Sequence, residues 1–169
     1  SVERALDLDS PAQLIASVLS KKAAAGSTHV VIDIPIGETA KVRTREEAGH
    51  LKNLMMYVAR SINMNLDVVF TDGSQPVGRG IGPALEAMDV LAVLRGDVNA
   101  PSDLRDRSLM LSGRLLEMTG KAVQGKGYEH AQSILDSGDA WKKCLAICNA
   151  QGRFSEPVPG EFRFEIRSD

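Results

Sequence analysis

A serine and a lysine lie four residues apart in the segment PAQLIASVLSKKAAAG, residues 11–26. At 100° per residue, Ser17 and Lys21 share one edge of a helix, beside an apolar stripe that includes Leu14 and Val18. A hydroxyl and an ammonium group in this arrangement could form the wall of a ligand site. The same spacing is also typical of a solvated helix edge, so the pattern by itself leaves both interpretations open.

A second candidate group follows the segment DIPIG, where a glycine marks the point at which the chain leaves a strand. Lys41 comes four residues after Gly37. Ligands of open α/β sheets bind outside the carboxyl ends of the strands, so Lys41 is placed where an anion would sit. An exposed loop lysine is the alternative. Asp33, inside the same strand, is either a buried carboxylate that needs a partner or a structural residue.

Three glycines precede a helix in TDGSQPVGRGIGPALEA. Gly78, Gly80 and Gly82 form a GxGxG pattern that superficially resembles a dinucleotide fingerprint. The third glycine comes one residue too early for GxGxxG, and several residues separate the glycines from the preceding strand. We therefore favour a close backbone crossing or turn over a phosphate cradle.

Caps, glycines and hydrophobic runs predict the elements that position these residues. Asp9 or Ser10 caps a helix that begins at Pro11, and Thr44 with Glu47 forms a capping box that opens a long helix. The β-branched runs THVVIDIPIG and NLDVVFTDG are typical of buried parallel strands. The predicted order is a helix from Pro11 to Gly26, a strand over 28–37, a helix over 44–63, a strand over 65–73, a helix from Pro83 to Gly96, helices within 101–120, 127–138 and 139–152, and a lone strand in FRFEI, residues 162–166.

This order indicates the α/β class, with a partial parallel sheet flanked by helices. Two strands are too few for a complete covered sheet, and the chain opens without an initiator Met, so we expect an internal piece of a longer protein.

Composition argues against several other classes of function. The formal charge is -2 and aromatic residues make up 4% of the chain, so no basic stripe or set of base-stacking side chains indicates nucleic-acid binding. The cluster KVRTR, residues 41–45, is interpreted as a soluble loop that leads into a helix. Cys144 and Cys148 share one helix face as reduced core residues, and the three histidines form no zinc spacing with them. We therefore expect no metal site and no membrane segment.

Four separated motifs together resemble consecutive segments of the thymidine phosphorylase family, above all its branch of AMP phosphorylases and bacterial thymidine phosphorylase homologues. They are DSPAQLIASVLSKKAAAG, VVIDIPIGETAKV, FTDGSQPVGRGIGPALEA and LLEMTG, and they occur in the order of the family. The resemblance implies a helical lobe hinged to an α/β lobe, followed by an α+β portion. In these terms residues 1–26 end the helical lobe with one helix, residues 27–154 are part of the α/β phosphorylase domain, and residues 155–169 are a linker and the first strand of the C-terminal portion.

The resemblance also implies roles for individual residues. In LDSPAQLIAS, Asp9 would be the proton donor to the departing base, and Ser17 would hydrogen-bond the nucleobase or nucleotide. Lys21 would contact the base, and Lys41 in GETAK would contact the nucleotide in the AMP-using branch. The phosphate loop of the family lies on the amino-terminal side of this segment.

From this resemblance we expect a pentosyltransferase that cleaves the N-glycosidic bond of a nucleoside with phosphate. Two alternatives stay open: a phosphorylase of nucleoside 5′-monophosphates, and a non-catalytic nucleotide-binding domain. No cofactor is expected beyond inorganic phosphate as co-substrate, and the partners would be a nucleoside or nucleotide and phosphate, with no nucleic acid and no membrane. The whole protein is expected to be a cytoplasmic homo-oligomer, such as a dimer, and the 169-residue chain alone is expected to be inactive.

Overall fold

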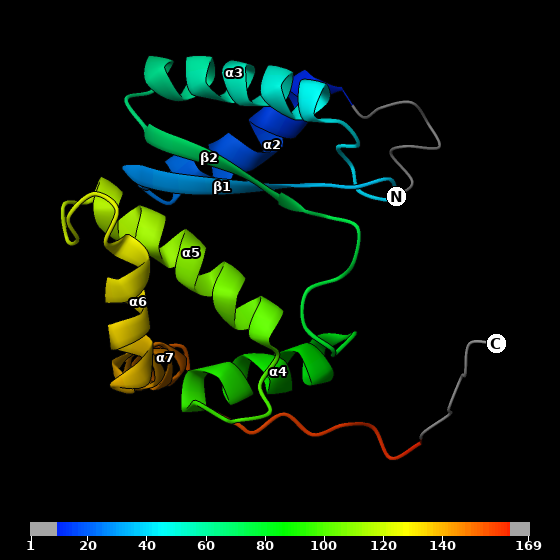
Figure 1. Ribbon diagram of the computed structural model, residues 1–169, viewed down its shortest axis with the longest axis vertical. Helices are drawn as coiled ribbons and strands as arrows, with labels where there is room; N and C mark the ends of the chain where they lie inside the picture. The colour runs from blue at the N-terminus through cyan, green and yellow to red at the C-terminus, as the bar shows by residue number, and fades with distance from the viewer. Residues whose placement is uncertain (1–9, 163–169) are drawn as a thin grey trace. The chain divides into compact units, whose positions relative to one another are not determined.

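The computed structural model describes residues 10–162. The predicted order of elements is confirmed within this range (Figure 1), while FRFEI lies, apart from Phe162, outside the described residues. The elements are α2 (Pro11–Ala24), β1 (His29–Ile36), α3 (Arg45–Ser61), β2 (Asn65–Asp72), α4 (Pro83–Arg95), α5 (Ser102–Met118), α6 (Gly127–Asp136) and α7 (Asp139–Ala150).

The two strands pair in parallel, in a continuous register from His29 opposite Asn65 to Ile36 opposite Asp72. Parallel neighbours require a crossover connection, and α3 provides it. The expected α/β class with a partial parallel sheet is therefore confirmed. Because both strands run the same way, both carboxyl ends lie at one edge of the sheet, and the loop from β1 to α3 must start there.

One face of this sheet lies in the main hydrophobic core. Side chains of even number, such as Val30 and Ile34 of β1 and Val68 of β2, share that face and are buried. Both α2 and α3 cover the core with fully buried side chains, Leu19 and Met55 being the largest. Burying a side chain of this size contributes about 1.5–3 kcal/mol each, so the core holds α2, α3 and the sheet together.

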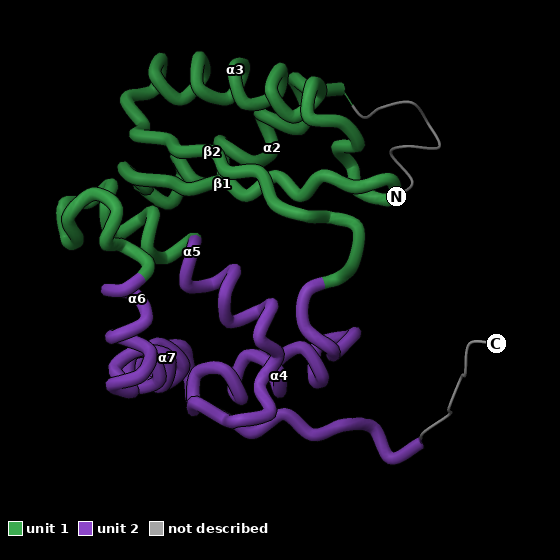
Figure 2. Tube along the Cα trace, viewed as in Figure 1, with its two compact units in different colours: residues 1–76, 111–128 green, residues 77–110, 129–169 purple. Residues whose placement is uncertain are grey.

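The described chain divides into two compact units (Figure 2). The first contains residues 10–76 and 111–128, with α2, β1, α3 and β2; the second contains residues 77–110 and 129–162, with α4 and α7. Since α2 shares its core with the sheet, it belongs to the first unit in this chain. The division of a longer protein into lobes at residues 26 and 154 stays a prediction.

In the second unit, aromatic contacts attach the segment after α7 to the helices. The Arg95 guanidinium at the end of α4 lies 4.7 Å from the ring centroid of Trp141 on α7. The rings of Trp141 and Phe154 meet edge to face with centroids 5.5 Å apart, and Arg95 also pairs with Glu156. A guanidinium over an aromatic face is attracted by the ring quadrupole, so these contacts stabilise the path of the chain beyond Ala150.

The two strand exits approach each other so closely that only glycine fits. A Cβ added to Gly37 would lie 2.5 Å from the carbonyl carbon and oxygen of Gly73, and the Gly73 N–H donates to Ile36 O at 2.9 Å. Both obstructing atoms belong to backbone, so they cannot rotate away. This contact sets how the chain leaves β1 and therefore where residues 38–44 begin.

We expect Gly37→Ala to lower the free energy of unfolding by about 1–3 kcal/mol, because the added methyl overpacks a backbone contact. Gly49→Ala is the matched control, since a Cβ there meets no atom within 4 Å inside α3. That change should stabilise the chain by about 0.5–1 kcal/mol. Urea unfolding of both variants measures the difference, and a Gly37→Ala protein as stable as the parent chain would contradict the close contact.

Candidate functional site

Ser17 and Lys21 lie on the exposed edge of α2, as the sequence predicts. The Lys21 ammonium donates to Ser17 Oγ at 3.5 Å, the long limit of a hydrogen bond. Ser10 is the N-cap of the same helix and accepts from the Gln13 N–H at 3.2 Å, so Ser10 is the residue that caps this helix. A weak bond between two exposed side chains is easily exchanged for bonds to a ligand.

The loop between β1 and α3 carries Lys41 in a defined conformation. The Gly37 N–H donates to Val42 O at 3.2 Å, and Val42 forms a bridge with Ile36, so the chain is locally extended at this point. Val42 packs against the hydrophobic core. In an extended segment neighbouring side chains point to opposite sides, so Lys41 and Arg43 lie together on the side away from the core.

The capping box predicted from sequence fixes the end of this loop. Thr44 Oγ1 accepts from the Glu47 N–H at 3.1 Å. Glu47 Oε2 accepts from the backbone N–H groups of Arg43 at 2.9 Å and Thr44 at 3.2 Å. These two bonds, that to Arg43 first, lower the pKa of the Glu47 carboxyl below its usual value. The ionised carboxylate therefore holds the backbone that carries Arg43.

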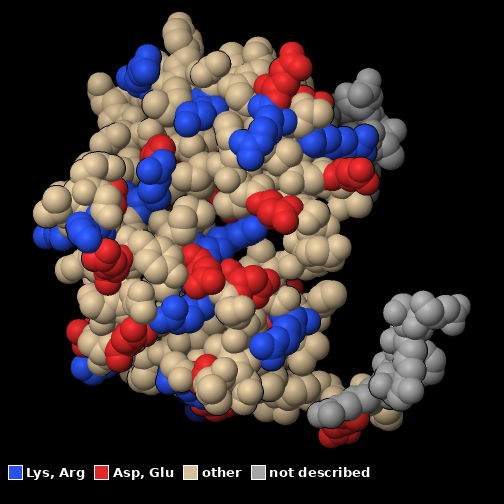
Figure 3. All heavy atoms as spheres, in the orientation of Figure 1, with Lys and Arg blue, Asp and Glu red and all other residues tan. Residues whose placement is uncertain are grey.

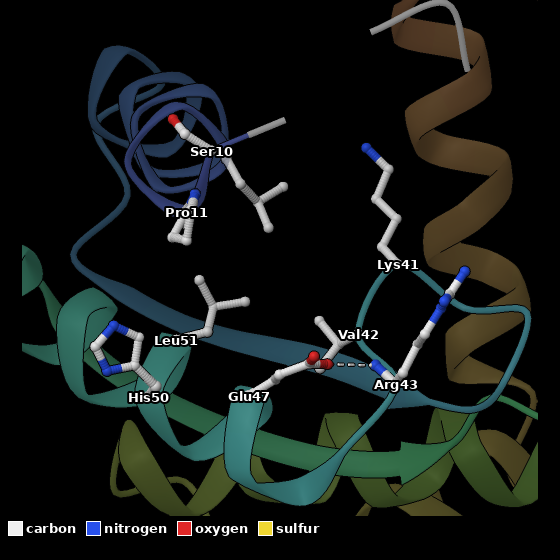
Figure 4. A pocket seen from close by; sticks show the side chains of 9 residues that line it. Ser10, Pro11, Lys41, Val42, Arg43, Glu47, His50 and Leu51 are labelled. Carbon is white, nitrogen blue, oxygen red and sulfur yellow. Dashed lines mark hydrogen bonds between the residues drawn. The ribbon is translucent and has the colours of Figure 1, made fainter. Parts of the chain in front are cut away.

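A cavity of about 410 Å³ opens between the start of α2, this loop and the first turns of α3 (Figure 4). We call it the polar cavity. Figure 4 shows the side chains of Lys41 and Arg43 extending away from the loop toward the same side, while Glu47 is turned toward the Arg43 backbone. The cavity is lined by Ser10, Pro11, Leu14, Lys41, Val42, Arg43, Glu47, His50 and Leu51.

A second cavity, of about 370 Å³, adjoins the first and is mainly apolar. The two share four lining residues, Leu14, Lys41, Val42 and Leu51, and the apolar cavity continues along Val18, Ala40 and Met55 and over the end of β1, residues 32–35. Volumes of this order are typical of small-molecule sites, which combine apolar walls with a few polar groups. Lys41 lies where the two cavities join.

The edge of α2 that carries Ser17 and Lys21 borders the face that lines the apolar cavity. Around the helix axis, Ser17 is about 60° and Lys21 about 20° from Leu14, which lines both cavities. Ser17 and Lys21 themselves line neither cavity, whereas Lys41 lines both. The structure therefore places the three residues in one compact unit, but brings only Lys41 to the cavity walls. Asp9 lies outside the described residues.

The structure reveals two further residues of the polar cavity, Arg43 and His50, which our sequence analysis did not propose as site residues. The interpretation of KVRTR as a loop that leads into a helix is confirmed, and Lys41 was proposed as a site residue, but the sequence analysis missed that Arg43 also lines the cavity. The signal was available in the alternation of Lys41, Val42 and Arg43, because an apolar residue between two cations is typical of a segment with one buried and one open side.

The GxGxG segment is a close backbone turn, as favoured from sequence. The N–H groups of Arg79 and Gly80 both donate to Asp89 Oδ2 at 2.7 Å, and that of Gly78 donates to Asp103 Oδ2 at 2.9 Å. These bonds lower the pKa values of the Asp89 and Asp103 carboxyls. Carboxylates of the chain itself already occupy the amides that a phosphate would need.

Asp33 and the two cysteines, which the sequence analysis also considered, have contacts within the fold. Asp33 Oδ1 accepts from Thr71 Oγ1 at 2.6 Å across the two strands, which gives this carboxylate a partner. Cys144 and Cys148 are free, half-buried thiols. Burial, and to a smaller extent the neighbouring Cys148, raises the pKa of the Cys144 thiol.

No helix within residues 10–162 is long and apolar enough to cross a membrane. On the face in Figure 3, cationic and anionic side chains are interspersed.

Comparison with known proteins gives matches over nearly the whole chain. It is 57% identical over 168 residues to a protein named putative thymidine phosphorylase from Hahella chejuensis, and 58% identical over 165 residues to one from Ralstonia nicotianae. These matches cover 99% and 98% of the chain. They confirm the resemblance to thymidine phosphorylases. No family model matches the chain.

The chain spans about a third of the length of these relatives, 33% and 32% respectively. A third relative, from Acidovorax sp. and named putative thymidine phosphorylase 1, is 59% identical over 155 residues, or 92% of the chain and 30% of that protein. The two candidate groups and both cavities lie between residues 10 and 55, inside the portion that aligns nearly end to end in the first two relatives.

The capping box predicts a pH-dependent contact at the mouth of the polar cavity. Because the folded pKa of Glu47 is lowered, its bonds to Arg43 and Thr44 stabilise the fold fully above its ordinary pKa of 4.5. This contribution is lost as the pH falls through the folded value. The amide chemical shifts of Arg43 and Thr44 should therefore titrate together, at a pH below 4.5.

In Glu47→Gln both titrations should vanish, while Glu46→Gln, which removes a carboxylate from the same first helical turn, should leave them in place. Amides that keep titrating in Glu47→Gln would mean that another group controls the loop.

Proposed function

We propose that this chain is part of a thymidine phosphorylase-like pentosyltransferase that cleaves the N-glycosidic bond of a nucleoside with phosphate. The observation that carries the proposal is identity of 54–59% to proteins named putative thymidine phosphorylase, over 92–99% of the chain. The two adjoining cavities support it, because they offer an apolar wall for a base and cations for an anion.

The proposed reaction is a displacement at the anomeric carbon of the sugar. A phosphate oxygen forms the new bond to that carbon as the carbon–nitrogen bond breaks, and the bonding electron pair leaves with the base. Asp9, acting as general acid, gives its proton to the base nitrogen, so the products are free base and pentose 1-phosphate. Hydrogen-bond donors of the protein that contact the base stabilise the negative charge that develops on it.

Ser17 and Lys21 would supply such donors from α2. Their mutual hydrogen bond of 3.5 Å keeps the hydroxyl and the ammonium group near each other on one exposed helix edge. A base next to this edge would receive one neutral and one charged donor, and charge-assisted bonds are the stronger of the two kinds. The edge is adjacent to Leu14, which lines both cavities, so the apolar surface of a base bound there would lie beside its polar contacts.

A phosphorylase of nucleoside 5′-monophosphates is the second candidate, and a specific observation favours it. Lys41 lies at the junction of the polar and apolar cavities, so a ligand that fills the apolar cavity would have its phosphate near the cations of the polar one. A non-catalytic nucleotide-binding domain is less well supported, because carboxylates occupy the amides of the GxGxG turn. The inactivity of the 169-residue chain alone stays a prediction, as do the oligomer and its cytoplasmic location.

We expect Asp9→Asn in the whole protein to lower kcat by roughly 10²-fold or more with little change in substrate binding, as loss of a general acid should. Ser10, and not Asp9, caps α2, so a loss of activity would not arise from a missing cap. Asp7→Asn is the control for removal of a nearby negative charge. Normal turnover by Asp9→Asn, measured as phosphate-dependent base release, would exclude the acid role.

We expect Lys41→Met to reduce kcat/KM for nucleoside monophosphates by roughly 10- to 150-fold, and to leave unphosphorylated nucleosides nearly unaffected. A charge-assisted contact to a 5′-phosphate is worth about 1.5–3 kcal/mol, which corresponds to that factor. Steady-state kinetics with a panel of nucleosides and their 5′-monophosphates measures both. Equal losses of kcat/KM for nucleosides and nucleoside monophosphates would refute the proposal that Lys41 binds the 5′-phosphate.

A further inference from the structure

Arg43 is held at the polar cavity by its backbone, so its side chain is not needed to build the loop. The Arg43 N–H bonds the Glu47 carboxylate, and the neighbouring Val42 is anchored in the core and bridged to Ile36. The guanidinium itself is exposed and forms no ion pair within 4 Å among residues 10–162. After the backbone hydrogen bonds, its charge also helps to lower the pKa of the nearby Glu47 carboxyl, but without a salt bridge to a described residue the guanidinium can still turn to a ligand.

The charges around the cavity favour an anion with two negative charges. Lys41 and Arg43 are basic side chains on the same side of an extended segment, and both line the cavity (Figure 4). Glu47 is the one carboxylate in the described lining, and its charge is already stabilised by two backbone N–H groups. Of the Lys, Arg, Asp and Glu side chains in the described lining, the two that remain available are therefore both positive.

We infer that Arg43 and Lys41 act as a pair that binds the dianionic phosphoryl group of a phosphate monoester, with Arg43 determining specificity for phosphorylated substrates. Arg43 offers a planar fork that donates two parallel hydrogen bonds to phosphate oxygens, while Lys41 supplies a compact charge. The inference rests on the proposed function and adds a residue to it. The same chemistry would also suit inorganic phosphate as co-substrate, so the experiment separates the two sources.

Arg45 provides a matched control because it carries the same charge two residues further along the chain. It is the first residue of α3, is exposed, and lines neither cavity. Arg43→Gln and Arg45→Gln therefore remove the same charge from the same region, and Arg43→Lys keeps the charge but loses the fork. The Arg43 backbone bond to Glu47 is available in every variant, and circular dichroism with thermal unfolding checks that each one folds.

The experiment measures kcat/KM of the whole protein for nucleosides and nucleoside 5′-monophosphates, the KM for inorganic phosphate, and direct calorimetric binding of the monophosphates. Arg43→Gln should weaken monophosphate binding and lower the matching kcat/KM by roughly 10- to 100-fold, with nucleoside kinetics unchanged. Arg43→Lys should restore part of the loss, and Arg45→Gln should match the wild type. If instead the KM for inorganic phosphate rises and monophosphate binding is unchanged, the pair binds the co-substrate and the inference is overturned.

The outcomes for the pair and for the proposed function are distinguishable. Wild-type kinetics for both anions in Arg43→Gln, or equal effects of Arg43→Gln and Arg45→Gln, would overturn the inference while phosphorolysis stands. Selective loss of monophosphate binding in a protein that shows no phosphorolysis would support the inference and refute the proposed function. Failure of the wild type to bind either anion would refute the inference outright.

Discussion

Parallel pairing of β1 and β2 is the constraint on which the candidate site depends. Two parallel strands cannot be joined by a tight turn, so the chain leaves β1 at the carboxyl edge, crosses through α3 and returns. The close contact of Gly37 with Gly73 fixes how it leaves, and the Val42 bridge to Ile36 fixes the next few residues. Lys41 and Arg43 lie on the short loop between this exit and α3, and both line the polar cavity.

The same loop shows how a carboxylate can support a cationic site without neutralising it. Glu47 directs its oxygen to the N–H groups of Arg43 and Thr44, which satisfies two amides at the start of α3. An acid placed there also interacts favourably with the helix dipole. The GxGxG turn uses the same chemistry with the opposite result, because Asp89 and Asp103 occupy its amides and exclude an anion. In both segments carboxylates accept hydrogen bonds from backbone N–H groups. In the loop before α3 these bonds leave the side chains of Lys41 and Arg43 available, whereas in the GxGxG turn they occupy the amides that an anion would need.

Much of the fold could be predicted from local sequence signals, because those signals are themselves local. Pro11, the Thr44–Glu47 box and the β-branched runs each determine one element within a few residues. The partners that cross long distances could not be predicted this way. Asp103 lies 25 residues beyond Gly78, and Thr71 lies 38 residues beyond Asp33, so only the folded chain identifies them. The same limit applies to Arg43, whose cavity is also lined by Ser10, the N-cap residue of α2.

The candidate site therefore combines two kinds of information. The resemblance implies roles for Ser17, Lys21 and Lys41; in the structure Lys41 lines both cavities, Ser17 and Lys21 lie on the neighbouring exposed edge of α2, and Asp9 lies outside the described residues. The helix edge offers hydrogen bonds of mixed charge, which suit a base, whereas the loop offers two cations, which suit a phosphate. Because the apolar cavity lies beside both, a ligand with a flat apolar part and an anionic end satisfies all three surfaces at once. Under the proposed function, a neutral nucleoside would leave the loop cations without a partner, and that difference in charge would be the physical basis for discrimination between the two substrate classes.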